Sequence, residues 1–99
     1  MLKKKFFKTK DECEVSFELP AHDAKQIDLV CEANGWQPIR MKKAKGRFRT
    51  RIRLPKERHF QFRYLVDRTS WVNDEAADAY LRNEFGSDNS VLVTVPPPV

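Results

Sequence analysis

The sequence predicts an all-β protein folded as a β-sandwich. Apolar and polar residues alternate over several short segments of the 99-residue chain, which is the pattern of strands with one buried face. A proline or a turn pair such as Asn34 and Gly35 follows these segments, so the strands are short and joined by turns. A chain of this length holds one domain around one core.

Four strands are predicted between residues 13 and 67. Residues 13–19 form the first, which Pro20 ends, and residues 27–32 form the second, in a segment that closes at Trp36. Residues 46–54 form the third strand and residues 59–67 the fourth. Their inward positions supply the predicted core, which consists of Phe17, Leu29, Phe48, Ile52, Phe62 and Tyr64.

The last third of the chain is predicted to hold a short extended piece around Trp71, a helical turn and a final strand. Residues 73–82 have a helical periodicity that indicates a turn or two of helix, with one face formed by Ala76, Ala77, Tyr80 and Leu81. Residues 90–95 form the last strand, which the prolines at 96–98 end. Short strands with little helix predict an immunoglobulin-like sandwich of the early-set type, with one short helical turn before the last strand.

The domain is expected to span residues 11–95, between a basic N-terminal segment (1–10) and a proline-rich C-terminal tail (96–99). We interpret the basic segment as a solvated end, in which Phe6 or Phe7 packs on the sandwich or on another chain. Cys13 and Cys31 fall inside apolar alternations, as small buried side chains do. With no apolar run of signal-peptide or membrane-spanning length, we expect a reduced cytoplasmic protein without a membrane partner.

The formal charge of +5 arises from 19 Lys and Arg against 14 Asp and Glu, which raises the possibility of an anionic partner. Outward positions of the third strand carry a stripe of four arginines, residues 47, 49, 51 and 53. If the first strand lies beside it, Glu12, Glu14 and Glu18 form cross-strand ion pairs with this stripe. We favour this structural interpretation over nucleic-acid binding, so nucleic acid is not an expected partner.

Residue patterns for catalysis or metal binding are absent from the sequence. His22 and His59 lie far apart, without cysteine or carboxylate at metal-ligand spacing. Carboxylate pairs such as Asp74 with Glu75, or Asp78 with Glu84, are interpreted as solvating surface charges rather than a glycosidase pair. We therefore expect no catalytic residues, no metal and no cofactor.

The order of several short motifs resembles carbohydrate-binding modules of family 48, the isoamylase N-terminal-like or glycogen-binding domains. The resemblance covers nearly the whole of residues 13–95. Its motifs are the Asn-Gly-Trp at 34–36, the strand from Gly46 to Leu54 and Pro55, the run at 61–67, Trp71, and the Phe-Gly-Ser-Asp-Asn-Ser at 85–90.

The resemblance implies a non-catalytic module that binds α-1,4-linked glucan, such as glycogen or starch. By position, the sugar site would consist of Trp36, Arg63, Trp71 and Asn89. The resemblance further implies that Phe85 presses on the curve of the glucan and that Ser87 supplies a hydroxyl. Indole rings stack on the C–H face of glucose, while arginine and asparagine bond its hydroxyl rim.

The resemblance also implies that this chain acts as a free targeting or adaptor domain for a glycogen-metabolising enzyme. A homodimer paired through an exposed strand edge is a further possibility. The rival interpretation is a protein–protein interaction module that keeps the fold without glucan binding. A basic nucleic-acid-binding β domain is the third, and steep loss of affinity with salt would distinguish it.

Overall fold

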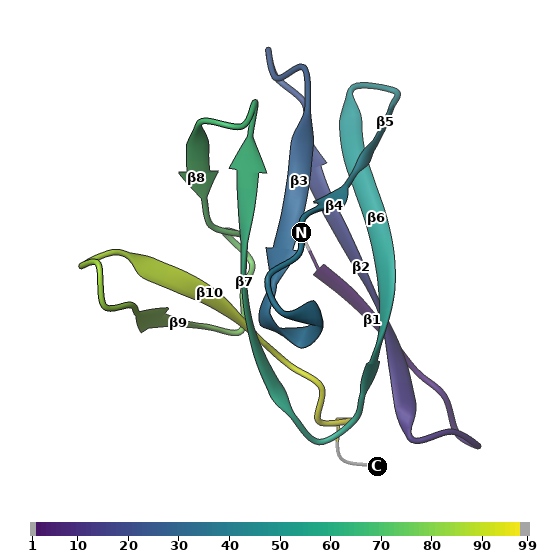
Figure 1. The fold of residues 1–99 in the computed structure, drawn as a ribbon. Helices are drawn as coiled ribbons and strands as arrows, with labels where there is room; N and C mark the ends of the chain where they lie inside the picture. Colours follow the sequence, from purple (N-terminus) through teal and green to yellow (C-terminus); the bar gives the residue numbers. More distant parts are fainter. Residues whose placement is uncertain (1, 98–99) are drawn as a thin grey trace.

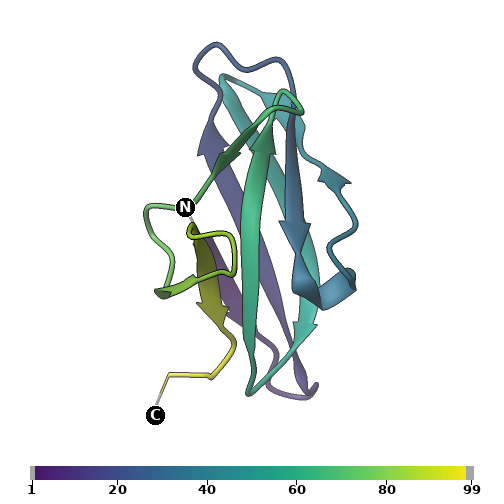
Figure 2. The same ribbon diagram turned by 60° about the vertical axis from the view of Figure 1, so that its left-hand side comes forward.

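The computed structural model describes residues 2–97 as two antiparallel β-sheets packed face to face (Figures 1 and 2). One sheet has the strand order β1-β2-β6-β5, and the other has the order β4-β3-β7-β10-β9, with β8 paired to β7. The expected all-β, immunoglobulin-like sandwich is confirmed. The elements are β1 (Leu2–Phe6), β2 (Glu12–Pro20), β3 (Ile27–Cys31), the 3-10 turn η1 (Glu32–Asn34), β4 (Ile39–Arg40), β5 (Lys42–Ala44), β6 (Arg47–Pro55), β7 (His59–Val66), β8 (Ser70–Val72), β9 (Ala79–Arg82) and β10 (Asp88–Val93).

The core lies between the sheets and is built around three aromatic rings. Phe17 of β2 meets Phe62 of β7 edge to face at 5.2 Å between ring centroids, and Phe62 meets Tyr64 at 5.7 Å. Such edge-to-face pairs add to the free energy gained by burying the rings. The predicted core residues all belong to this core, with Ile52 only partly buried.

The expected cross-strand ion pairs between the arginine stripe of β6 and the glutamates of β2 form for Glu14 and Glu18, whereas Glu12 lies opposite Pro55. These strands are direct neighbours, with Glu18 opposite Arg49. Glu18 forms ion pairs with Arg47 and Arg49, and Arg51 lies 3.7 Å from the Glu14 carboxylate. Each exposed pair contributes under about 1 kcal/mol.

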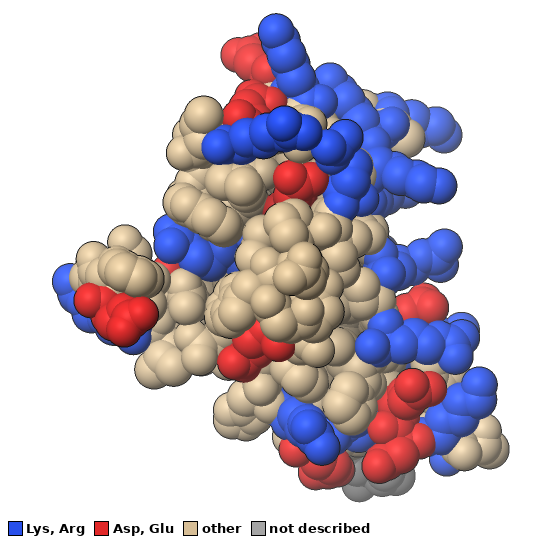
Figure 3. Space-filling model, viewed as in Figure 1, with Lys and Arg blue, Asp and Glu red and all other residues tan. Residues whose placement is uncertain are grey.

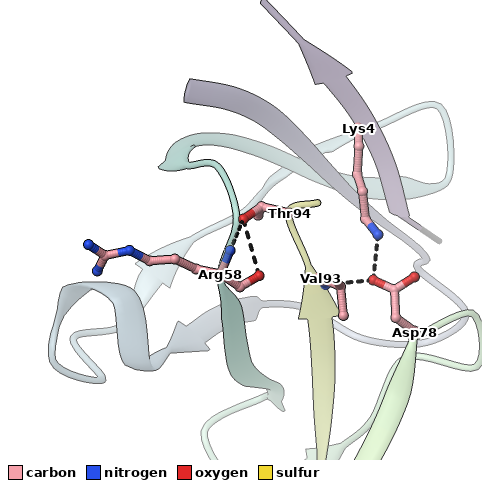
Figure 4. Close-up of polar contacts among 5 residues, drawn as sticks. All are labelled: Lys4, Arg58, Asp78, Val93 and Thr94. Atoms are coloured by element: carbon pink, nitrogen blue, oxygen red, sulfur yellow. Dashed lines mark hydrogen bonds and ion pairs between the residues drawn. The ribbon is translucent and has the colours of Figure 1, made fainter. Parts of the chain in front are cut away.

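The basic N-terminal segment is not the solvated end that the sequence predicted. Residues 2–6 form β1, which pairs with β2 over its whole length. Leu2 and Phe6 pack against the core. Lys4 forms an ion pair with Asp78, whose carboxylate also accepts a 2.7 Å hydrogen bond from the backbone N–H of Val93 (Figure 4). This contact ties β1 to the opposite sheet.

The helical turn predicted within residues 73–82 is also wrong. Residues 79–82 form β9, which pairs with β10, and η1 is the one helical element within residues 2–97. Asp74 is buried before β9, where its carboxylate accepts a hydrogen bond from the Tyr64 hydroxyl. A short isolated helix has little stability of its own, so hydrogen bonds to the sheet determine this segment.

The last strand begins and ends two residues earlier than predicted, at Asp88 and Val93. Thr94 follows it and is fully buried. Its hydroxyl accepts a 3.0 Å hydrogen bond from the Arg58 N–H and lies 3.1 Å from the Arg58 carbonyl oxygen (Figure 4). The same hydroxyl donates to the Pro55 carbonyl at 2.7 Å. Thr94 therefore fixes the C-terminal end of the sandwich to the β6–β7 turn.

The two cysteines are free and buried, as the sequence predicted. Burial raises the pKa of the Cys13 thiol and that of the Cys31 thiol. Both thiols are therefore held in the unreactive, protonated form. Within residues 2–97, no helix is long and apolar enough to cross a membrane.

Candidate functional site

The outward face of the six-stranded sheet carries a groove of about 650 Å³. We call it the tryptophan groove. Strand register places Arg63 opposite Val30 and Trp71 opposite Leu65, so side chains from β3, β7 and β8 share this face. The lining residues that bear on function are Trp36, Gln61, Arg63, Trp71, Phe85 and Asn89.

Arg63 and Trp71 form a stacked pair on one side of the groove. The inward neighbours of Arg63 on β7, Phe62 and Tyr64, are buried in the core, so the alternation of the strand directs Arg63 outward. Its guanidinium carbon Cζ lies 5.4 Å from the centroid of the Trp71 ring, within the range of a cation–π contact. The pair leaves the Trp71 side chain 48% exposed, so the indole is held in place and remains open to a ligand.

The Arg63 Nε atom is buried and makes no hydrogen bond to any atom of residues 2–97. A buried donor without an acceptor costs free energy.

Trp36 approaches the groove from a strained turn after β3. η1 ends at Asn34, and the two residues after it, Gly35 and Trp36, have φ angles of 73° and 67°. Glycine adopts this left-handed conformation freely, whereas a bulky aromatic residue pays about 1–3 kcal/mol for it. A 3.0 Å hydrogen bond from the Trp36 N–H to the Cys31 carbonyl closes the turn. Trp36 is 40% exposed, so the strained turn keeps part of this apolar ring in contact with solvent.

The floor of the groove is a chain of side-chain amides. Asn89 is buried, and its Nδ2 donates to the Gln61 Oε1 at 3.0 Å. Its Oδ1 accepts from the Asn83 Nδ2 at 3.2 Å. The Asn89 oxygen and one of its amide hydrogens are therefore used within the protein, which leaves one amide hydrogen for a ligand. Asn89 acts first as a support for Gln61.

The loop of residues 83–87 forms the outer rim. The Asn83 Oδ1 accepts hydrogen bonds from the N–H groups of Phe85, at 2.9 Å, and Ser87, at 3.1 Å. This side-chain capped turn presents the Phe85 ring, which is 85% exposed. Ser87 lies in the same loop but does not line the groove. The structure thus brings together Trp36, Arg63, Trp71, Asn89 and Phe85, and leaves Ser87 outside.

Leu81, Arg82 and Asn83 also line the groove, and the sequence reasoning missed them. The helical periodicity of residues 73–82 predicts a helical turn there, whereas Leu81 and Arg82 lie on β9 and Asn83 follows it. The signal that could have found them is a hairpin pattern, in which an extended segment and residues 88–93 flank a polar turn containing Gly86.

Two apolar rings on one groove, with an arginine and amides between them, suit a ligand that has both apolar faces and hydroxyl groups. The rings supply stacking surfaces, and Arg63 and Gln61 supply hydrogen-bonding groups.

The fold and the groove define the class as an immunoglobulin-like β-sandwich with partly exposed aromatic side chains on one face. No protein-family model and no curated protein matches the sequence. Similar solved structures are those of the enterobactin esterase FES from Shigella flexneri, in the presence of 2,3-di-hydroxy-N-benzoyl-serine (TM-score 0.74, 10% identity, 97% of this chain and 33% of that chain) and in the presence of enterobactin (TM-score 0.74, 11% identity, 97% and 34%). This chain spans about a third of the length of the esterase. At this identity the likeness shows the fold alone.

Proposed function

We propose that this chain is a non-catalytic module that binds α-1,4-linked glucan in the tryptophan groove. The observation that carries the proposal is the placement of Trp36 and Trp71, both partly exposed, on one groove with the Arg63 guanidinium stacked on the second ring. The resemblance of the sequence motifs to glycogen-binding modules supports the same ligand.

Stacking supplies the affinity in this proposal. A glucose ring has C–H groups on its faces, and these gain from contact with an indole in the same way as other apolar surfaces. Successive glucose units of one chain would contact Trp36 and Trp71, with Phe85 against the outside of the curve. The guanidinium of Arg63, which lines the groove, would donate to hydroxyl or ring oxygens of the glucan.

Binding without catalysis is the second part of the proposal. Glycoside hydrolysis generally uses two carboxylates across the scissile bond. Among the described residues that line the groove, Glu84 is the one carboxylate. The proposal therefore assigns the groove to retention of the polymer and not to its cleavage.

Calorimetric titration with maltoheptaose and with β-cyclodextrin tests the proposal. Trp36→Ala and Trp71→Ala are each expected to weaken binding by about tenfold or more, which corresponds to about 1.4 kcal/mol. Val72→Ala is the matched control, because Val72 neighbours Trp71 on β8 and lies opposite the inward-facing Tyr64. The control is expected to bind as the wild type does.

Raising the salt concentration separates stacking from charge. A neutral glucan held by indole rings keeps its affinity between low and high salt, because no counterions are released. Absence of heat with either ligand, or equal loss of affinity in the Val72→Ala control, would contradict the proposal. Release of reducing ends from maltoheptaose would contradict its non-catalytic part.

A second candidate function is protein binding through the same face. It is favoured by Phe85, the most exposed large apolar residue described, and by Leu81, which is 52% exposed beside it. Clusters of this kind mark interaction sites on soluble proteins. Failure to bind glucan, together with concentration-dependent association that Phe85→Ser abolishes in sedimentation velocity, would favour this function as self-association.

A further inference from the structure

The outer face of the four-stranded sheet lies on the opposite side of the sandwich from the tryptophan groove. Strand register sets out its side chains in rows. One row joins Lys3 of β1 to Ser16 of β2 and Arg51 of β6. The neighbouring row joins Arg49 to Lys42 of β5. Figure 3 shows lysine and arginine side chains gathered along this side of the molecule, over β5 and β6.

This face carries more positive charge than the glutamates of β2 neutralise. The three outward carboxylates are those of Glu12, Glu14 and Glu18. Glu18 is shared between two arginines, and the closest contact of Glu14 with Arg51 is 3.7 Å. The outward cations of the same rows are Lys3, Lys5, Lys42, Arg47, Arg49, Arg51 and Arg53. The surplus depends on β1 and β5, which add lysines on either side of the arginine stripe.

The cations surround a hollow of about 740 Å³. Its lining includes Lys3, Lys42, Arg49 and Arg51, together with Glu18 and with Arg40, which is ion-paired with Asp28. The small side chain of Ser16 lies between Lys3 and Arg51 in the register, which leaves room there and adds a hydroxyl donor. An anionic oxygen in this hollow would have several donors within reach.

An aromatic ring lies at one end of the same face. Phe7 follows β1 and is half-buried. The Arg53 Cζ lies 5.0 Å from the centroid of its ring, and the Nζ atoms of Lys5 and Lys10 lie 5.7 and 5.8 Å from it. A line of cations that ends at an aromatic ring is the pattern of a single-strand nucleic-acid groove, in which the backbone follows the charges and a base stacks on the ring.

We propose that this face binds single-stranded nucleic acid, independently of the glucan proposal. Arg49, Arg51 and Arg53 are alternate residues of one strand, so their Cα atoms are about 6.8 Å apart. This regular line suits the repeating phosphates of an extended strand, and Phe7 stacks on a base at its end. The outward positions of this sheet have no large apolar side chains for insertion into a lipid surface within β1, β2, β5 and β6 as described.

Fluorescence anisotropy with labelled dT15, over a series of sodium chloride concentrations, tests this proposal. The triple variant Arg49→Gln, Arg51→Gln, Arg53→Gln is expected to weaken binding at low salt and to reduce the slope of log K against log salt by about 2, from three lost phosphate contacts at about 0.7 each. Phe7→Leu is expected to weaken binding about tenfold, through the lost stacking. Maltoheptaose binding should be unchanged in both variants, so the two proposals fail separately.

The matched control removes three positive charges elsewhere. Lys25, Arg58 and Arg68 are exposed outside this face, and their triple change to Gln is expected to retain most of the dT15 affinity. Equal losses in the two triple variants would overturn the proposal, because net charge alone would then explain binding. It would also be overturned by absence of dT15 binding at 50 mM salt, or by inorganic polyphosphate binding as tightly as dT15 with no effect of Phe7→Leu.

Discussion

The Tyr64 hydroxyl donates a 2.7 Å hydrogen bond to the Asp74 carboxylate inside the sandwich, beneath the segment that joins Trp71 to β9. Asp74 also accepts from the Ala76 N–H at 2.8 Å, and its own N–H donates to the Ser90 hydroxyl. One buried carboxylate therefore shapes the connection between two elements that line the tryptophan groove. The pairing of Tyr64 with Asp74 supports both the fold and the site.

Because of this pair, the protein is expected to lose stability at alkaline pH. Burial, and then the Asp74 carboxylate, raise the pKa of Tyr64 well above its ordinary value of 10.0. The folded state holds this proton more tightly than the unfolded state, so the contribution is complete below pH 10 and declines as the pH rises above 10, by up to about 1.4 kcal/mol per pH unit. We expect Tyr64→Phe to be less stable at pH 7, by about 1–3 kcal/mol, and to lose less stability above pH 10. Urea unfolding between pH 7 and 11 measures both, and parallel profiles for the two proteins would refute the expectation.

Trp36 is expected to be costly for the fold and necessary for the ligand. A change to glycine removes the strain of its positive φ and also the packing of a partly exposed ring. Because the two effects oppose each other, Trp36→Gly should change the free energy of unfolding by less than about 1 kcal/mol while abolishing glucan binding. Thermal unfolding and calorimetric titration measure the two properties. A large loss of stability would show that Trp36 is chiefly a packing residue.

Arg63 is expected to act through its planar guanidinium as well as its charge. Lysine keeps the charge, but it loses the stacked plane over Trp71 and the Nε donor. Arg63→Lys should weaken maltoheptaose binding about fivefold and should alter the emission spectrum of Trp71 in a Trp36→Phe background. Arg68→Lys is the control, since Arg68 is exposed outside the groove. Wild-type affinity in Arg63→Lys would limit the role of Arg63 to charge.

β1 is expected to be required for a stable sandwich. Phe6 packs against the core, and its change to alanine should lower the free energy of unfolding by about 2–4 kcal/mol. The ion pair of Lys4 with Asp78 is partly exposed, so Lys4→Gln should cost about 1 kcal/mol or less. Denaturant unfolding ranks the two variants. Equal and small losses would mean that β1 contributes charge but little packing.

The sandwich could be predicted because the four strands predicted between residues 13 and 67 correspond to β2, β3, β6 and β7. Each of these is an inner strand of its sheet. In β2 the alternation of residues such as Phe17 with polar neighbours is strict, and in β6 and β7 it holds over most of the strand. Burial of one face then leaves little freedom in register. β9 was missed because four exposed residues have no buried face to create a pattern. β1 was missed because its lysines conceal the inward positions of Leu2 and Phe6.

The candidate site was predicted in part. The resemblance to glycogen-binding modules implied Trp36, Arg63 and Trp71, and the structure places all three on one groove. The contacts of Asn89 with Gln61 and Asn83 depend on the β9–β10 hairpin, which local periodicity did not show. The exclusion of Ser87 from the groove depends on the Asn83 turn in the same hairpin.

β7 serves two surfaces at once, since Phe62 and Tyr64 fill the core while Gln61 and Arg63 face the groove. A slip of one residue in its pairing with β3 would expose the aromatic rings and bury the guanidinium. An insertion or deletion of one residue in this strand is therefore expected to disrupt the core as well as the groove. Evolution of the groove must then proceed through β8, the η1 turn and the 83–87 loop, where replacement of a side chain leaves the sandwich intact.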